Sequence, residues 1–179
     1  MALTGSDQFD GNLTHPFLDE DGDKLREECG VFGAINAEKA SAATALGLHA
    51  LQHRGQEAAG ITSFTGKDFI SRRGLGHVGE NFSSKEAIDE LPGNMAAGHV
   101  RYSTTGGAGL RNVQPLYAEL ASGGFAIAHN GNISNALALR KDLVGKGSIF
   151  QSTSDTEVII HLVATSRYPT VADRLIDAL

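Results

Sequence analysis

Strand-like runs come early in this chain and its helical runs concentrate late, and this order constrains the fold more than any other feature. The strand-like runs occupy residues 30–36, 58–66, 68–74, 94–104 and 123–132. Two of them, 58–66 and 68–74, are separated by a short glycine-containing turn, which predicts a β-hairpin. Because a simple alternation of strand and helix fits poorly, the sequence predicts an α+β fold of layered helices and mostly antiparallel sheets.

The first strand-like run and two helical runs after it lead to three specific expectations. Residues 30–36, GVFGAIN, alternate apolar with small residues, which predicts a buried strand. Residues 38–53 are predicted to form an amphipathic helix, and residues 83–91 a short helix capped by a serine. The apolar positions of the first helix are Ala40, Ala43, Leu46, Leu48 and Leu51.

Two later helices carry recognisable start signals. Residues 134–144 are expected to form a helix opened by Ser134. Residues 152–166 contain Ser154 followed three residues later by Glu157, which predicts a capping box and then an apolar helix.

Composition separates a leader from one folded domain and excludes several classes of function. Residues 1–28 are acidic, are interrupted by Gly and Pro, and show no sustained period, which predicts a disordered leader.

The net charge of −6 provides no basic surface for nucleic acid. No apolar run is long enough to span a bilayer, and the N-terminus lacks the pattern of a secretory signal. We therefore expect a cytoplasmic protein without nucleic-acid or membrane partners.

The chain's only cysteine, Cys29, lies where the leader meets the first strand. A lone cysteine is usually a small buried hydrophobe, and it can form neither an internal disulfide nor a thiolate cluster. If the chain were cut after Glu28, however, the thiol would belong to the N-terminal residue. Its α-amine, with a reference pKa of about 7.7–8.0, could then act as the general base. Cys29 is therefore a candidate nucleophile that needs no histidine.

Three polar segments could supply the other groups of an active site. Arg101 lies in residues 98–107, where a strand-like run passes into a polar loop, and it offers a planar fork suited to a carboxylate. Asn130 and the backbone N–H of Gly131 could form an oxyanion hole, and Asp155 could bind an ammonium group. Each also has an ordinary explanation: a surface arginine, an Asn-Gly turn, and a carboxylate at a helix N-terminus.

Five ordered motifs favour the functional interpretation: ECGVFGAIN, LQHRGQEAAGI, GHVRYSTTG, AHNGNISNA and STSDTEV. Together they closely resemble the glutamine amidotransferases of the N-terminal-nucleophile class, and within that class the amidophosphoribosyltransferase family. The resemblance extends from Cys29 to about Leu179. It implies a four-layer αββα sandwich of mostly antiparallel sheets.

The resemblance also implies a domain organisation. Residues 1–28 correspond to a propeptide, and residues 29–179 to a class II glutaminase domain that is incomplete at its C-terminus. The phosphoribosyltransferase domain of the family is absent from this sequence.

Roles follow from the resemblance residue by residue. The Cys29 thiolate would attack the side-chain amide of glutamine, with Asn130 and Gly131 as the oxyanion hole. Arg101 matches the partner of the glutamine α-carboxylate, and Asp155 the acceptor of its α-ammonium. The further glutamine-binding positions are Arg54, Tyr102 and Thr104.

In the family, the released ammonia reacts with phosphoribosyl pyrophosphate to give 5-phosphoribosylamine, the first committed step of de novo purine synthesis. The resemblance implies no cofactor or metal in this part of the protein. Mg²⁺ and, in some relatives, a 4Fe-4S cluster are expected only with the missing domain. A homotetramer is expected for the full-length enzyme.

Three alternatives differ from this interpretation. A glucosamine-6-phosphate synthase type of amidotransferase usually has Tyr-Arg-Gly-Tyr where this chain has His-Arg-Gly-Gln at residues 53–56. A cysteine hydrolase would use an internal base, either His99 or His129, and would need no leader removal. An inactive uncleaved precursor, or a glutamine-binding module, would have no turnover.

Overall fold

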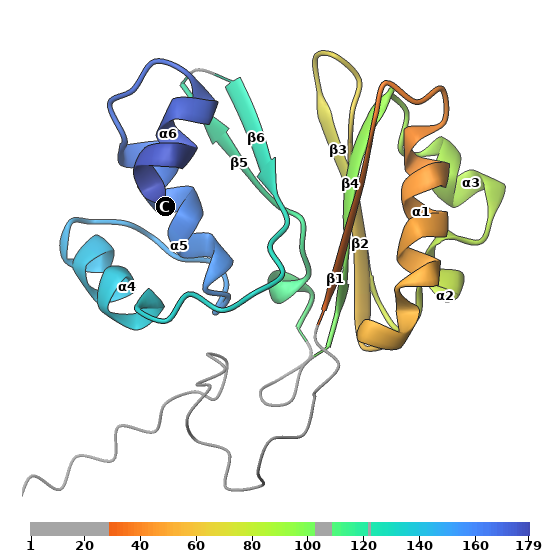
Figure 1. The fold of residues 1–179 in the computed structure, drawn as a ribbon, viewed down its shortest axis with the longest axis horizontal. Coiled ribbons are helices and arrows are strands. Elements are labelled where there is room, and N and C mark those ends of the chain that lie inside the picture. Colours follow the sequence, from red (N-terminus) through yellow and green to blue (C-terminus); the bar gives the residue numbers. More distant parts are fainter. Residues whose placement is uncertain (1–28, 103–108, 122) are drawn as a thin grey trace, which may run out of the picture.

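The computed structural model describes residues 29–102, 109–121 and 123–179. These residues form two antiparallel sheets that lie side by side, each covered on its outer face by helices (Figure 1). The layers therefore run helix, sheet, sheet, helix, and the predicted α+β class is confirmed. No helix of the described segments has the length and apolar character needed to cross a bilayer.

The larger sheet is built from the strands β1 (Gly30–Ile35), β2 (Ala58–Phe64), β3 (Phe69–Leu75) and β4 (Met95–Arg101). Their order in the sheet is β1-β4-β2-β3, with every neighbouring pair antiparallel. The predicted hairpin of β2 and β3 is confirmed, and Phe64 pairs with Phe69 beside its turn. The first strand pairs with β4 from Gly30 opposite Val100 to Ile35 opposite Met95.

The strand at residues 30–35 is less buried than the sequence predicted. It lies at the edge of the four-stranded sheet, so only β4 pairs with it among the described residues. Gly30 is buried, but Phe32 is 37 % exposed and Ile35 is 70 % exposed. The alternation of apolar and small residues does not distinguish an edge strand from a central one, which is why the prediction of burial was wrong.

Helix α1 (Ala40–Ala50) covers the larger sheet, together with the short helices α2 (Val78–Phe82) and α3 (Lys85–Asp89) (Figure 1). The serine cap of α3 is confirmed, because the Ser84 hydroxyl accepts a hydrogen bond from Ala87 N. The core beneath these helices is apolar and includes Leu48, Ile61, Phe82 and Val100.

The buried face of α1 differs from the predicted one. Leu46 is 73 % exposed, whereas Ser41 and Thr44 are buried. The hydroxyl groups of both buried residues donate hydrogen bonds to backbone carbonyls: Ser41 to Leu91 O at 2.5 Å and Thr44 to Ala96 O at 3.5 Å. Small polar residues can therefore occupy the core face, because their hydroxyls are satisfied there.

The smaller sheet joins β5 (Leu116–Leu120) to β6 (Gly123–Ile127). Its helices are α4 (Ala136–Gly145), α5 (Thr156–Thr165) and α6 (Val171–Ala178). Leu116 and Phe125 of the sheet pack with Ile159 and Val163 of α5. The two sheets meet where the Phe69 and Tyr117 rings lie 5.5 Å apart.

Two helix-start predictions were wrong. The N-cap of α4 is Asn135 rather than Ser134, and its side chain makes no capping hydrogen bond. The capping box predicted from Ser154 and Glu157 does not form, because α5 begins one residue later than that pattern requires, after Asp155. The Glu157 carboxylate instead binds the loop before the helix.

Candidate active site

Cys29 directly precedes β1 and lies beside the end of β4. Its Sγ accepts a hydrogen bond from Tyr102 N at 3.4 Å and lies 3.6 Å from Tyr102 O. The sheet register places these residues together, because Gly30 pairs with Val100. The predicted nucleophile and the predicted Arg101–Tyr102 segment are therefore neighbours.

Two further predicted residues contact Cys29 from distant segments of the chain. Arg54 donates a hydrogen bond from Nε to Cys29 O at 3.1 Å, and Asn130 donates one from Nδ2 to the same oxygen at 2.8 Å. Arg54 belongs to the turn after α1, and Asn130 to the loop after β6. The fold thus brings three separated motifs to one point.

A close backbone approach positions Arg54. A Cβ on Gly55 would lie 2.7–2.9 Å from backbone atoms of Val100 and Arg101, so only glycine lets this turn pack on the end of β4. Glu57 N also donates to Arg101 O at 3.2 Å. The turn that carries Arg54 is therefore packed directly against the strand that carries Arg101.

The loop with Asn130 and Gly131 is held by side chains rather than by a sheet. His129 N donates a hydrogen bond to Gln114 Oε1 at 2.7 Å. His129 Nδ1 lies 3.5 Å from Thr156 Oγ1. Gly131 has φ +154°, and a Cβ there would lie 2.9 Å from His129 Nε2. Gln114, which sequence reasoning missed, therefore helps to place the candidate oxyanion donors.

Asp155 lies at the N-cap of α5 and is tied to the same loop. Its Oδ2 accepts a hydrogen bond from Ile133 N at 2.9 Å, and its Oδ1 lies 3.5 Å from Thr156 Oγ1. The structure thus links the Asp155 carboxylate to the segment that follows Asn130. Thr104, the remaining predicted glutamine-binding residue, lies outside the residues that the structure describes.

His99 is a buried histidine of β4 that lies two residues before Arg101. Burial lowers its pKa to about 4, and the charge of Arg101 and the nearby His129 add to this lowering, while the His129 backbone opposes it. Neither ring nitrogen has a hydrogen-bond partner among the described residues. An imidazole with so low a pKa is a poor general base at neutral pH, which disfavours His99 as the base of a Cys–His dyad.

The residues that the structure describes contain no group of three or more His, Cys, Asp or Glu side chains that could hold a metal ion. The groups that the structure places against Cys29 are the Arg54 guanidinium, the Asn130 side-chain amide and the backbone of Tyr102.

Comparison with known proteins agrees with this arrangement. Residues 83–175 match the family described as "Glutamine amidotransferase domain". The chain is also 53 % identical over 140 residues to the amidophosphoribosyltransferase of Lacticaseibacillus casei, covering 78 % of this chain and 72 % of that protein. This chain belongs to the glutamine amidotransferase domain family.

Other relatives of this amidotransferase domain are longer. It is 56 % identical over 171 residues to the amidophosphoribosyltransferase of Rhizobium etli, covering 94 % of this chain and 34 % of that protein. A solved structure, "glutamine phosphoribosylpyrophosphate (PRPP) amidotransferase from B. subtilis complexed with ADP and GMP", superposes with a TM-score of 0.76 at 44 % identity. That match covers 83 % of this chain and 32 % of the solved chain. The chain therefore spans about a third of the length of these two relatives.

Proposed function

We propose that this amidotransferase domain hydrolyses glutamine to glutamate and ammonia through a thioester on Cys29. One observation carries the proposal: in a chain of this family, the sole cysteine lies where Arg54, Tyr102 and Asn130 converge. The Cys29 thiolate attacks the side-chain amide carbon of glutamine and forms a C–S bond. The C–N bond then breaks, and the nitrogen takes a proton and leaves as ammonia. Water attacks the thioester, which releases glutamate and restores the thiol.

The proposed oxyanion donors are Asn130 Nδ2 and the backbone N–H of Gly131. The attack makes the amide oxygen negative, and such charge is best stabilised by donors that are already in place. Asn130 Nδ2 is within hydrogen-bond distance of an atom of Cys29, so this donor lies beside the attacking residue.

We assign recognition of the α-amino-acid end of glutamine to two charged side chains, Arg101 and Asp155. We assign the α-carboxylate to Arg101, because a guanidinium binds a carboxylate with two parallel hydrogen bonds. We assign the α-ammonium to Asp155. Arg54, Tyr102 and Thr104 complete the proposed glutamine site.

The general base is proposed to be the α-amine of Cys29, which requires removal of residues 1–28. While Glu28 is attached, the nitrogen of Cys29 is an amide and has no useful basicity. The folded glutaminase domain accordingly begins at residue 29 in this proposal.

The whole protein is proposed to pass the ammonia to phosphoribosyl pyrophosphate and form 5-phosphoribosylamine. The support is the names of the relatives, amidophosphoribosyltransferase and PRPP amidotransferase, which favour this acceptor over a sugar phosphate. Mg²⁺ and any 4Fe-4S cluster would belong to the phosphoribosyltransferase part. We place the protein in the cytoplasm and propose that it assembles as a homotetramer.

Ammonia release from glutamine tests the proposal directly. The processed protein should release ammonia and glutamate in equal amounts, and Cys29→Ser should reduce this release to background. The Cys29→Ser variant should keep the thermal unfolding transition of the wild type, because a thiol and a hydroxyl differ little in size. Turnover by a folded Cys29→Ser variant at the wild-type rate would overturn the thioester mechanism. Formation of phosphoribosylamine, assayed separately in the whole protein, tests the acceptor.

A further inference from the structure

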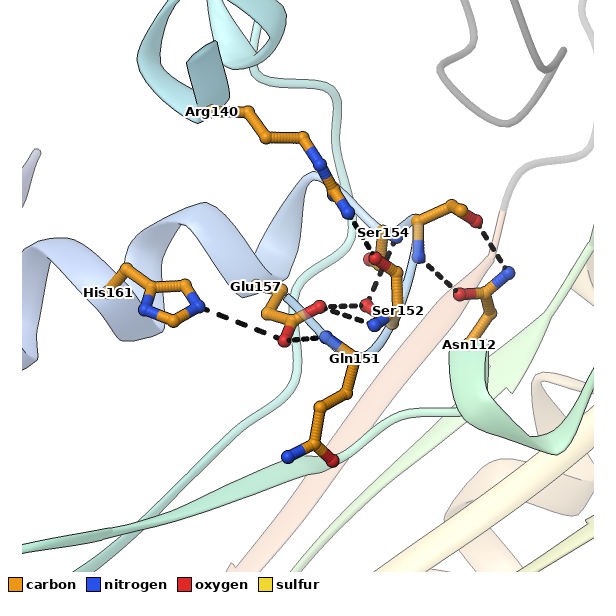
Figure 2. Close-up of polar contacts among 8 residues, drawn as sticks. Asn112, Arg140, Gln151, Ser152, Ser154, Glu157 and His161 are labelled. Atoms are coloured by element: carbon orange, nitrogen blue, oxygen red, sulfur yellow. Dashed lines mark hydrogen bonds and ion pairs between the residues drawn. The ribbon is translucent and has the colours of Figure 1, made fainter. Parts of the chain in front are cut away.

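The loop of residues 151–155 leads into α5 and carries Asp155, and buried side chains hold it in place. Figure 2 shows Glu157 and Asn112 contacting this loop from two sides. Glu157 comes from the first turn of α5, and Asn112 from the short 3₁₀ helix Leu110–Asn112. Both side chains are buried.

Glu157 directs its carboxylate back at the loop. Its Oε1 accepts a hydrogen bond from Gln151 N at 2.8 Å, and its Oε2 accepts from Ser152 N at 2.7 Å and from Ser152 Oγ at 2.6 Å. Ser152 Oγ in turn accepts a hydrogen bond from Ser154 N at 3.2 Å. Burying a carboxylate is costly unless it is well hydrogen-bonded, so these donors must keep their positions around it. Through Ser152, Glu157 is therefore linked to Ser154, the residue directly before Asp155.

Asn112 holds the middle of the loop with a pair of hydrogen bonds. Its Oδ1 accepts from Thr153 N at 2.9 Å, and its Nδ2 donates to Thr153 Oγ1 at 2.9 Å. Arg140 adds a third attachment, because its Nη2 donates to Ser152 O at 2.5 Å. Backbone groups at consecutive positions of the loop are thus bound by side chains from three other segments.

These attachments leave Asp155 oriented but still able to accept further hydrogen bonds. Its Oδ2 binds Ile133 N, and its Oδ1 is 3.5 Å from Thr156 Oγ1. An ionised carboxylate offers about four acceptor positions, so these contacts leave capacity for an ammonium group.

We propose that Glu157 and Asn112 are positioning residues, which fix the loop of residues 151–155 so that Asp155 can bind the α-ammonium group of glutamine. The inference rests on the proposed glutaminase function and adds two residues to it. Neither residue touches the substrate, and both act through the loop. A change at either should therefore alter recognition of the ammonium group more than the chemical step.

The main test compares Glu157→Gln with the wild type in the whole protein, using glutamine and its analogue that lacks the α-amino group. The variant keeps the size of the side chain but replaces one acceptor oxygen by a donor that faces the loop N–H groups. We expect the preference for glutamine over the analogue, as a ratio of kcat/KM values, to fall by about tenfold or more. The kcat for glutamine should change much less than KM. Asp142→Asn, an exposed carboxylate on α4 that pairs with Lys146, is the matched control and should leave the ratio unchanged.

A second pair of variants serves if Glu157→Gln fails to fold, as judged by its thermal transition. Thr153→Val removes the hydroxyl that Asn112 Nδ2 binds but keeps the shape of the side chain. Thr153→Ser keeps the hydroxyl. The preference for glutamine should fall in the valine variant and stay at the wild-type value in the serine variant.

Coupling to Asp155 separates positioning from a general loss of stability. In an Asp155→Asn background, adding Glu157→Gln should produce little further loss of preference, because the group that it positions is already gone. Folded variants with wild-type KM and wild-type preference would overturn the inference, as would a loss confined to kcat. The proposed function fails by a different result, namely a processed wild type that releases no ammonia from glutamine.

Discussion

The two halves of the molecule hold their parts of the candidate site in different ways. In the half built on β1–β4, Cys29 and Arg101 lie at the ends of paired strands, and Gly55 lets the Arg54 turn pack against the backbone of β4 (Figure 1). In the half built on β5 and β6, Asn130 and Asp155 lie on loops. Hydrogen bonds from a few polar side chains hold those loops: Gln114 binds the backbone of His129, and Glu157 binds the backbone of Ser152.

This difference predicts two kinds of mutational response. A strand end is placed by the whole ladder and the apolar core beneath it, so it moves only when much of the sheet is disturbed. A loop held by a few side chains can move while the core stays intact. Core changes in the first half should therefore affect stability, and polar changes in the second half should affect the kinetic constants.

The largest expected effect on stability is in the first half. Leu48 of α1 is fully buried, and Leu48→Ala should lower the free energy of unfolding by about 2–5 kcal/mol through lost contacts and a cavity. Leu46→Ala on the same helix is the control, because Leu46 is exposed and its removal should cost little. Denaturant titration of both variants measures the contrast. Equal losses would contradict the core assigned to this half.

The largest expected effect on kcat is in the second half. Asn130→Ala removes a donor aimed at the developing oxyanion, and such losses reduce kcat by about 10²–10³-fold. KM should change little, because the oxyanion is not yet formed in bound glutamine. Steady-state kinetics decide this point. A raised KM with unchanged kcat would show that Asn130 binds ground-state glutamine instead.

A buried histidine of the first half should make stability depend on pH. The pKa of His99 is about 4 in the folded protein, below the ordinary value of 6.5, so the unfolded state binds the proton more readily. The free energy of unfolding therefore keeps its full value above pH 6.5, where His99 is neutral in both states. It decreases as the pH falls from 6.5 towards 4, because only the unfolded state takes up the proton in that range. The loss amounts to on the order of 3 kcal/mol.

His99→Phe should flatten this pH dependence in denaturant titrations between pH 7 and pH 4. In the second half, burial also lowers the pKa of His161, although Glu157 opposes the shift. His161→Phe should therefore flatten the profile less than His99→Phe does. The reverse order would contradict the burial assigned to His99.

The smallest effects should come from the groups that hold the unreactive end of glutamine, one in each half. Loss of a charge-assisted hydrogen bond costs about 1.5–3 kcal/mol, so Arg101→Ala or Asp155→Ala should raise KM roughly 10- to 150-fold. The kcat should stay near the wild-type value in both variants. Initial rates across a range of glutamine concentrations measure this, and a loss confined to kcat would remove both residues from the binding role.

Local signals in the sequence predicted the elements that depend on neighbouring residues. The hairpin of β2 and β3 and the Ser84 cap were predicted, because turn and cap chemistry acts over a few residues. The α+β class was predicted from the order of the strand-like and helical runs. The exposure of Ile35 and Leu46 was not predicted, because it depends on which strand lies at the sheet edge and how α1 is rotated on it.

The sequence indicated which motifs lie together at the candidate site, but not which residues hold them in place. The motifs around Cys29, Arg54, Tyr102 and Asn130 were predicted to act together, and the structure brings them together. The supporting residues were missed, because their contacts cross large sequence separations: Asn112 binds Thr153 and Gln114 binds the residue before Asn130. No local pattern marks such pairs. At Glu157 the local pattern was also misleading, because this side chain binds the loop instead of completing a capping box.

The central claim is that Cys29, as an N-terminal residue, is the nucleophile that attacks glutamine. The most direct measurement treats active protein with a glutamine analogue that carries an electrophilic carbon in place of the side-chain amide, followed by intact mass and N-terminal peptide mapping. The account predicts one label per chain, on a peptide that begins Cys-Gly-Val-Phe, and loss of activity in proportion to labelling. Label on another residue, or on Cys29 in an active chain that still carries Glu28 before it, would contradict the account.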